Sequence, residues 1–256
     1  MQKAVEIVSG GLTLRGMLHM PEKVRGKVPA VIIFHGFTGN KMEPHFIFVK
    51  LSRMLEKRGI ASVRFDFGGS GESDGDFRDM TLSGEIREAH SILDYAKKLD
   101  GIDPERIGVV GLSMGGAVAS ALAGERKEDV KSLCLWAPAG NMGELIMSHE
   151  AGKNIELVKK AGYADVGGLL LGTGFLDDIL KLDIFEIAKR YDKKVLILHG
   201  DKDAAVPLST SERYLKCYGG RAELKIIKDA DHTFNHADWE REVLESTVER
   251  LAKELD

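Results

Sequence analysis

The chain has 256 residues, of which 43% are hydrophobic and 30% are charged, a balance typical of a folded globular protein rather than a disordered one. Its net charge is −4 and no cluster of Lys and Arg is present, which argues against nucleic acid as a partner, because binding phosphates requires concentrated basic residues. No run of about 18 apolar residues could span a membrane, and residues 1–8 lack the apolar core of a signal peptide. We therefore expect a cytoplasmic protein without membrane contact.

Hydrophobic periodicity predicts strands and helices that alternate along the chain. Two short strands, 4–8 and 12–19, flank a Gly10-Gly11 turn. Further on, continuous apolar runs predict buried strands, and amphipathic runs predict the helices between them. The expected strands are 28–34, 60–67, 106–111, 131–136, 194–199 and 223–227, and the expected helices are 46–58, 81–98, 114–123, 209–217 and 239–255. This alternation predicts an α/β protein with a mainly parallel central sheet and helices on both faces.

The segment between Pro138 and Tyr191 interrupts this alternation. It has more than fifty residues with a helical pattern and no strand signal, which is too long for a structureless loop in a compact domain. We therefore predict an inserted helical cap at 140–189 and a core formed by 1–139 and 190–256. Because such caps usually cover binding sites, a substrate is expected beneath it.

Two pentapeptides match the pattern Gly-x-Ser-x-Gly, in which a serine can be held on a sharp turn. Gly111-Leu112-Ser113-Met114-Gly115 follows a predicted buried strand and precedes a helix of small residues, the context that a strained nucleophilic serine requires. Gly71-Glu72-Ser73-Asp74-Gly75 lies instead in a polar loop, with a carboxylate on each side of its serine. Ser113 is therefore the predicted nucleophile, and Ser73 is expected to be a solvated loop residue.

A serine hydroxyl needs a positioned base that takes its proton. Of the eight histidines, only His232 and His236 follow the last predicted strand, where the chain order Ser, acid, His requires the base. His232 lies in a tight turn five residues beyond Ile227, whereas His236 lies beside the final helix, where a histidine commonly caps the helix or faces solvent. We therefore predict His232 as the base.

The acid that orients this histidine should lie on another loop at a strand end. The loop after strand 194–199 offers Asp201 and Asp203. Asp203 stands before the Val206-Pro207 pair that begins the next helix, and we favour it as the acid. Asp201 is expected to form a turn by hydrogen bonding to its own backbone.

Two backbone N–H groups should stabilise the negative charge that develops during the reaction. One is expected from Met114, which follows the nucleophile at the start of its helix, and the other from Phe37, in the loop after strand 28–34. His35 is expected to hold that loop rather than to react. No group of His, Cys, Asp or Glu has the spacing of a metal site, and no phosphate-binding glycine pattern is present, so we expect no metal and no cofactor.

With these residues assigned, the chain resembles the α/β-hydrolase superfamily over its whole length and, within it, the cinnamoyl and feruloyl esterases of fermentative bacteria. The resemblance rests on residues 35–39, 69–75, 111–115, 137–139 and 199–207 and on the turn at His232. It implies the α/β-hydrolase fold and hydrolysis of a carboxylic ester through an acyl-enzyme. By position it implies the triad Ser113, Asp203 and His232 and the oxyanion donors Phe37 and Met114.

The same resemblance implies a pocket for an aromatic acyl group beneath the cap. The candidates for its walls are the aromatic residues Trp136, Tyr163 and Phe175. The candidates for accepting a hydrogen bond from a phenolic hydroxyl are the carboxylates Glu144 and Asp178. Some relatives have a tyrosine for this hydroxyl at the position that we align with Phe175.

Other functions remain open at this point. The partner is expected to be a small-molecule ester, and the sequence is also compatible with a homodimer. A general short-chain carboxylesterase, a monoacylglycerol lipase and a serine peptidase of the same fold are the alternatives. A non-catalytic binding module is disfavoured, because such modules typically lose a triad member and all three residue types are present here on the expected loops.

Overall fold

The computed structural model describes residues 1–22, 26–148 and 155–256. The strands of its main sheet are β1 (Gln2–Ser9), β2 (Leu12–His19), β3 (Val28–Phe34), β4 (Ala61–Phe65), β5 (Ile102–Leu112), β6 (Ser132–Trp136), β9 (Val195–Gly200) and β10 (Ala222–Ile227). Within the described residues they form an eight-stranded sheet in the order β1-β2-β4-β3-β5-β6-β9-β10. The pairs β1–β2 and β2–β4 are antiparallel, and the other pairs are parallel.

Side chains of the parallel strands alternate between two apolar clusters, one on each face of the sheet. In β3, Val31 and Ile33 belong to one cluster and Ile32 to the other, and in β5 Val109 and Val110 divide in the same way. Successive side chains of a strand point to opposite faces, so a strand buried on both faces needs apolar residues at every position. This explains the continuous apolar runs in the sequence.

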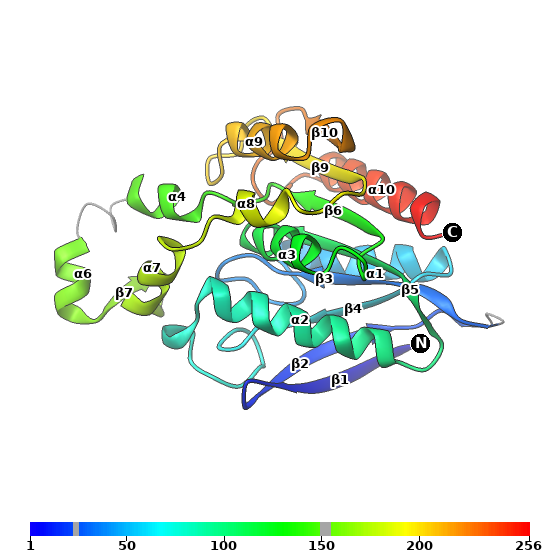
Figure 1. The fold of residues 1–256 in the computed structure, drawn as a ribbon, viewed down its shortest axis with the longest axis horizontal. Coiled ribbons are helices and arrows are strands. Elements are labelled where there is room, and N and C mark those ends of the chain that lie inside the picture. The colour runs from blue at the N-terminus through cyan, green and yellow to red at the C-terminus, as the bar shows by residue number, and fades with distance from the viewer. Residues whose placement is uncertain (23–25, 149–154) are drawn as a thin grey trace.

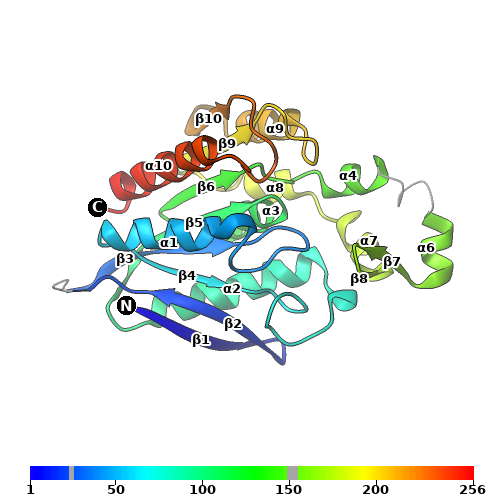
Figure 2. The same cartoon turned by 180° about the vertical axis from the view of Figure 1, so that it is seen from behind.

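Helices cover both faces of the sheet (Figures 1 and 2). One face carries α1 (Ile47–Lys57) and α10 (Ala237–Glu254), which contact each other. The other face carries α2 (Leu82–Lys98), α3 (Met114–Glu125), α8 (Ile184–Ala188) and α9 (Leu208–Tyr218). Short 3-10 turns lie at Pro44–Phe46, Phe77–Asp79 and Gly219–Arg221. The predicted fold class is confirmed, although β4 is shorter and β5 longer than the sequence pattern indicated.

The inserted segment projects beyond the sheet, on the left in Figure 1. It contains α4 (Met142–Ser148), α6 (Ile155–Ala161), β7 (Tyr163–Val166), β8 (Leu169–Gly172) and α7 (Thr173–Ile179). The expectation that this segment has no strands is wrong, because β7 and β8 pair as an antiparallel hairpin. Their two-residue turn is Gly167-Gly168, with φ of 61° and 91°, and such positive angles suit glycine at both positions. In the sequence, this pair of glycines was the signal from which the hairpin could have been predicted.

Helix α8 lies within the range predicted for the cap but packs against the core. Its partner is α3, where a Cβ on Gly124 would lie 2.1 Å from the carbonyl oxygen of Ile187. The close approach of the two helices therefore requires a glycine at position 124. In the described parts of the chain, no helix is long and apolar enough to cross a membrane.

Candidate active site

Ser113 lies on a sharp turn between β5 and α3. Its φ of 57° and ψ of −121° are strained for a residue with a side chain, and such strain persists only where the surroundings enforce it. The Ser113 N–H donates to the carbonyl oxygen of Trp136 at 2.8 Å, and the Ser113 carbonyl oxygen accepts from the N–H of Ala139 at 2.9 Å. Backbone bonds to the end of β6 and to the segment that follows it thus hold the turn.

The two glycines of the pentapeptide allow the turn to pack closely. A Cβ on Gly111 would lie 2.1 Å from the carbonyl oxygen of Gly115, and a Cβ on Gly115 would lie 2.3 Å from the carbonyl oxygen of His35. No side chain can occupy either position without a shift of the backbone. The spacing of glycines around Ser113 is therefore a packing requirement of the turn.

Ser73, in the second pentapeptide, is bonded to backbone instead. Its hydroxyl donates to the carbonyl oxygen of Asp66 at 2.6 Å and accepts the N–H of Arg15 at 2.8 Å. These bonds attach the 68–76 loop to β2. The hydroxyl of Ser73 is thus engaged in holding a loop.

His232 and Asp203 form a hydrogen-bonded pair. His232 Nδ1 lies 2.7 Å from Asp203 Oδ2, and because an ionised carboxylate can only accept, Nδ1 carries the hydrogen and Nε2 remains for another partner. The side chain of Asp203 is only 1% exposed, and Oδ1 accepts the N–H groups of Ala205 and Val206, both at 2.8 Å. The imidazole of His199 also lies near, with Nε2 3.1 Å from Oδ2.

The surroundings of Asp203 favour its charged form. Burial opposes ionisation, but the hydrogen bonds from His199 and His232 outweigh it and hold the pKa of this carboxyl below its usual range. His199 itself is fully buried and is fixed through Nδ1 by Ser211 Oγ at 2.6 Å. Sequence reasoning missed this role of His199, because the contact forms only when the loop after β9 folds back.

His236 and Asp201, which we did not favour as the base and the acid, have other hydrogen-bond partners. His236 caps α10, where its Nδ1 accepts the N–H of Asp238 at 3.2 Å. Asp201 does not form the turn with its own backbone that we expected: Oδ1 accepts the N–H of Asp229, 28 residues further along, at 2.7 Å. Asp201 therefore joins the loop after β9 to the loop that carries His232.

The backbone N–H groups of Phe37 and Met114 have no hydrogen-bond partner within the described residues. Both belong to loops that reach Ser113: Phe37 follows β3, and Met114 begins α3. His35 fixes the first loop, because Nδ1 lies 2.9 Å from the carbonyl oxygen of Gly36 and Nε2 accepts the N–H of Phe67 at 3.0 Å. These unpaired donors are suited to bind a developing oxyanion.

Glu43, which the sequence did not single out, lies beside this loop. It is 9% exposed, has a φ of 57°, and its Oε1 accepts the N–H of Gly36 at 2.6 Å. Burial raises the pKa of Glu43 to about 7, although the Gly36 N–H and the charge of His232 act in the opposite direction. It lines a cavity of about 460 Å³ that also reaches Ser113 and His232.

A second cavity, of about 550 Å³, connects Ser113 with the inserted segment. Apolar side chains from both parts of the chain form most of its wall, among them Phe37, Val206, Met142, Leu171 and Phe175, and it reaches Ser113 and His232. Phe175 is 1% exposed and stacks on Phe37, with ring centroids 5.5 Å apart and planes at 28°. Such a cavity has the volume of a small-molecule site.

Four of the predicted pocket residues lie elsewhere. Trp136 is fully buried on the α10 side of the sheet, where its indole N–H donates to Thr247. Glu144 pairs with Arg213 at 2.7 Å, and Tyr163 lies beneath the guanidinium of Arg78. Asp178 accepts the N–H of Ser83 at 2.8 Å. Of the five candidates, only Phe175 lines the cavity at Ser113.

Asp165 and Thr173 are polar residues that also line this cavity, and sequence reasoning missed both. Asp165 Oδ1 accepts the N–H of Gly168 at 2.8 Å. Asp165 lies in β7 and Thr173 directly follows β8, so their position depends on the hairpin that was not predicted. In the parts of the chain that the structure describes, no group of three or more His, Cys, Asp or Glu is arranged to hold a metal ion.

Comparison with known proteins identifies the fold independently. The family described as the alpha/beta hydrolase fold matches residues 29–168, more than half of the chain. Among solved structures, Est1E from Butyrivibrio proteoclasticus with ferulic acid bound is similar at a TM-score of 0.85 and 31% identity, over 97% of this chain and 100% of that chain.

Curated relatives match over shorter regions. YfhR of Salmonella typhi, an uncharacterised protein, is 28% identical over 209 residues, which are 80% of this chain and 64% of the relative. Human monoacylglycerol lipase ABHD6 is 29% identical over 116 residues, 45% of this chain and 32% of the relative. The chain thus spans less than two thirds of the length of these relatives. From the matched family and the similarity to Est1E, the chain belongs to the α/β-hydrolase fold family.

Proposed function

We propose that the protein is a serine carboxylesterase in which Ser113, His232 and Asp203 form the catalytic triad. The observation that carries the proposal is the His232–Asp203 pair, at 2.7 Å, on a cavity that Ser113 also lines from a strained turn. A buried acid, an oriented imidazole and a serine on such a turn together provide nucleophilic catalysis of acyl transfer.

The proposed reaction proceeds through an acyl-enzyme. His232 Nε2 takes the proton of Ser113 Oγ while that oxygen bonds to the ester carbonyl carbon. The N–H groups of Phe37 and Met114 stabilise the oxyanion of the tetrahedral intermediate. Its collapse breaks the bond to the alcohol oxygen, which receives the proton from His232, and a water molecule then hydrolyses the acyl-enzyme by the same steps.

We further propose that the acyl group is aromatic, with hydroxycinnamates as the substrate class. The apolar cavity and the stacked pair of Phe37 and Phe175 favour a flat acyl group, since aromatic contacts add roughly 0.5–1.5 kcal/mol beyond the burial of area. The ferulic acid bound in Est1E supports the same class. Asp165 and Thr173 are the proposed partners of a phenolic hydroxyl, in place of Glu144 and Asp178.

The triad is tested by Ser113→Ala. We expect esterase activity to fall by on the order of 10⁴–10⁶, because only binding and oxyanion stabilisation would remain, while the variant folds normally. Hydrolysis of p-nitrophenyl acetate and labelling by a fluorophosphonate probe measure the effect. Ser73→Ala is the matched control and should keep both activity and labelling; the reverse result would move the nucleophile to Ser73.

The substrate class is tested by kcat/KM on a panel of esters. Methyl ferulate and methyl p-coumarate should be hydrolysed more efficiently than methyl butyrate, and a monoacylglycerol and a peptide amide complete the panel. A preference for methyl butyrate or the monoacylglycerol would mean that the substrate has an aliphatic acyl group, and the proposal of the triad would still stand.

A further inference from the structure

A third cavity, of about 450 Å³, lies away from Ser113. Its walls come from the β1–β2 hairpin, the segment 68–81 and the first half of α2, and it shares no lining residue with the cavity between Ser113 and the inserted segment. Its lining includes four carboxyl groups: Asp76 and Asp79 at exposed positions, and Glu85 and Glu88 on α2. Nothing in the proposed esterase reaction uses these residues.

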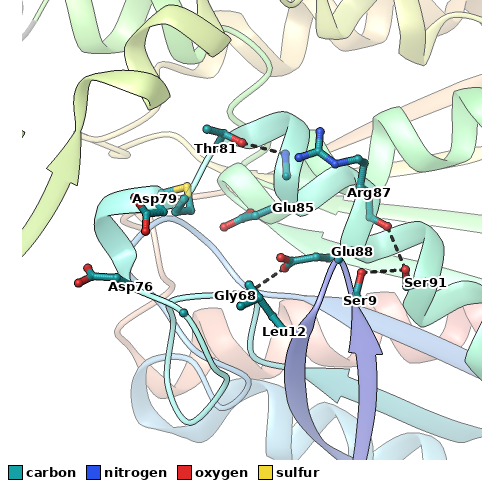
Figure 3. Close-up of a pocket in the computed structure, with 14 residues that line it drawn as sticks. Ser9, Leu12, Gly68, Asp76, Asp79, Thr81, Glu85, Arg87, Glu88 and Ser91 are labelled. Carbon is teal, nitrogen blue, oxygen red and sulfur yellow. Dashed lines mark hydrogen bonds between the residues drawn. The ribbon is translucent and has the colours of Figure 1, made fainter.

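Glu85 is the unusual member of this group. It is 2% exposed, and its Oε2 has no hydrogen-bond partner among the described residues. Figure 3 shows the carboxyl groups of Glu85 and Glu88 extending from α2 toward the segment that carries Gly68 and Asp79. A buried carboxyl oxygen without a donor is costly, so the site requires either a proton or a ligand that donates hydrogen bonds.

The residues around Glu85 do not supply a donor. The N–H of Gly68 donates to Glu88 Oε2 at 2.8 Å, and the hydroxyls of Ser9 and Ser91 bond to each other at 2.9 Å. Arg87 lines the cavity from an exposed position, and no ion pair joins it to either glutamate in the structure as described.

The surroundings of both glutamates therefore oppose their ionisation. Burial raises the pKa of Glu85 well above its ordinary value, and the charge of Glu88 adds to this effect. Burial also raises the pKa of Glu88, against the Gly68 N–H and the charge of Arg87. A cation placed beside the two carboxyls would relieve the repulsion and stabilise their charged forms.

The lining indicates which kind of cation fits. No three or more of the described His, Cys, Asp and Glu residues are arranged to hold a metal ion, which disfavours a metal shared by these carboxyls. Leu12 and Met80 add apolar surface to the wall, and the volume suits a small organic molecule. We propose that this cavity binds a short-chain aliphatic amine as its ammonium form, with the ammonium group hydrogen-bonded to Glu85 and Glu88 and the carbon chain against Leu12 and Met80.

The proposal is tested by calorimetric titration of the full chain at low salt. The probes are 1,4-diaminobutane, n-butylamine and uncharged 1,4-butanediol. We expect the two amines to bind at least tenfold more tightly than the diol, because only an ammonium group neutralises the paired carboxyls. An absence of amine binding, or equal binding of the diol, would overturn the proposal and leave a water-filled cavity with a protonated Glu85.

Variants locate the binding. Glu85→Gln keeps the shape of the side chain without its charge and should weaken amine binding at least tenfold. Glu212→Gln removes an exposed glutamate of α9 and should leave binding unchanged. If Glu85→Gln fails to fold, Glu88→Gln, which still accepts from the Gly68 N–H, replaces it. Unchanged amine binding in the folded glutamate variant would contradict the assignment of the amine to this cavity. So would binding of Ca²⁺ or Mg²⁺ to the wild-type protein that the glutamate variant abolishes.

Discussion

Asp203 receives hydrogen bonds from two backbone N–H groups and faces two imidazoles, so its orientation is fixed from several directions. Asp203→Asn would turn an amide toward His232 Nδ1 and favour the wrong tautomer of the imidazole. We expect kcat for ester hydrolysis to fall by on the order of 10²–10⁴ with little change in fold. Steady-state kinetics and circular dichroism measure the two effects.

Asp201→Asn is the control for this variant. The amide oxygen can still accept the N–H of Asp229, so activity should remain within a few-fold of wild type while thermal stability falls slightly. Equal losses of kcat in both variants would remove the distinction between an orienting acid and a residue that joins two loops.

Glu43 makes stability depend on pH in an unusual direction for a carboxyl group. Its pKa is about 7 in the folded protein, against an ordinary value of 4.5. Between these values the folded state binds the proton more tightly than the unfolded chain, so its contribution to the free energy of unfolding falls as the pH rises. Glu43→Gln, which does not titrate, should gain about 3 kcal/mol relative to wild type from about pH 4 to pH 8, at about 1.36 kcal/mol per pKa unit.

Urea unfolding of both proteins across this pH range measures the difference. Glu212→Gln is again the control, and its difference from wild type should not depend on pH in this way. Since the amide oxygen of Glu43→Gln can accept from Gly36, this variant should retain esterase activity, whereas Glu43→Ala leaves the N–H of Gly36 unpaired and should lower kcat. If the difference in the free energy of unfolding between Glu43→Gln and wild type does not change with pH, the pKa of Glu43 is not raised in the folded protein.

Single residues of the site differed in how far the sequence could predict them. Ser113, Asp203 and His232 could be proposed from the sequence because each follows a predictable strand and belongs to a recognisable motif, and their catalytic roles stay a prediction. Glu43 and His199 were not found, since their roles depend on a strained turn and on a loop that folds back. Trp136 was misplaced for a related reason: its strand was predicted, but the face to which its side chain points was not.

At the scale of elements, α7 brings the inserted segment to the loop after β3 through the contact of Phe175 with Phe37. Phe175→Ala would remove this wall of the cavity. We expect KM for methyl ferulate to rise by up to about tenfold, since stacking of up to about 1.5 kcal/mol corresponds to one order of magnitude. KM for an acetate ester, which does not reach Phe175, should change little.

Steady-state kinetics of the variant on both esters measure this difference. Leu180→Ala, at an exposed position after α7, is the control and should affect neither substrate. Equal increases of KM for both esters would indicate that Phe175 supports the fold of the segment rather than the acyl group.

Elements with a clear hydrophobic pattern were predicted well, whether buried on both faces or amphipathic, and the short strands of the inserted segment were missed. The core strands have apolar residues at nearly every position, which a reading of periodicity detects directly. Strands β7 and β8 are only four residues long, and so short a run does not show a period that distinguishes strand from helix. Only the Gly167-Gly168 pair distinguished the hairpin from helix, and it was outweighed by the surrounding helical pattern.

At the scale of the whole molecule, β3, β5, β6 and β9 are successive neighbours in the sheet and run parallel. Their carboxyl ends therefore meet at one edge, where the loops that carry Phe37, Ser113 and Asp203 follow β3, β5 and β9. This arrangement follows from topology rules and could be expected from the alternation of elements alone. A cap over the site was expected, but the contacts that place the inserted segment there, such as that of Phe175 with Phe37, could not be predicted, because they join residues far apart in the chain.

The path of the chain between β6 and β9 has a consequence for how this protein can change. These strands are neighbours, and α8 on α3 already supplies the crossover that two parallel strands require. The residues between Ala139 and Asp183 are thus an excursion that the sheet does not need in order to close. An exchange of this excursion would leave the strand-end loops in place, and with them the proposed reacting residues Ser113 and Asp203, while replacing much of the wall of the cavity beside Ser113.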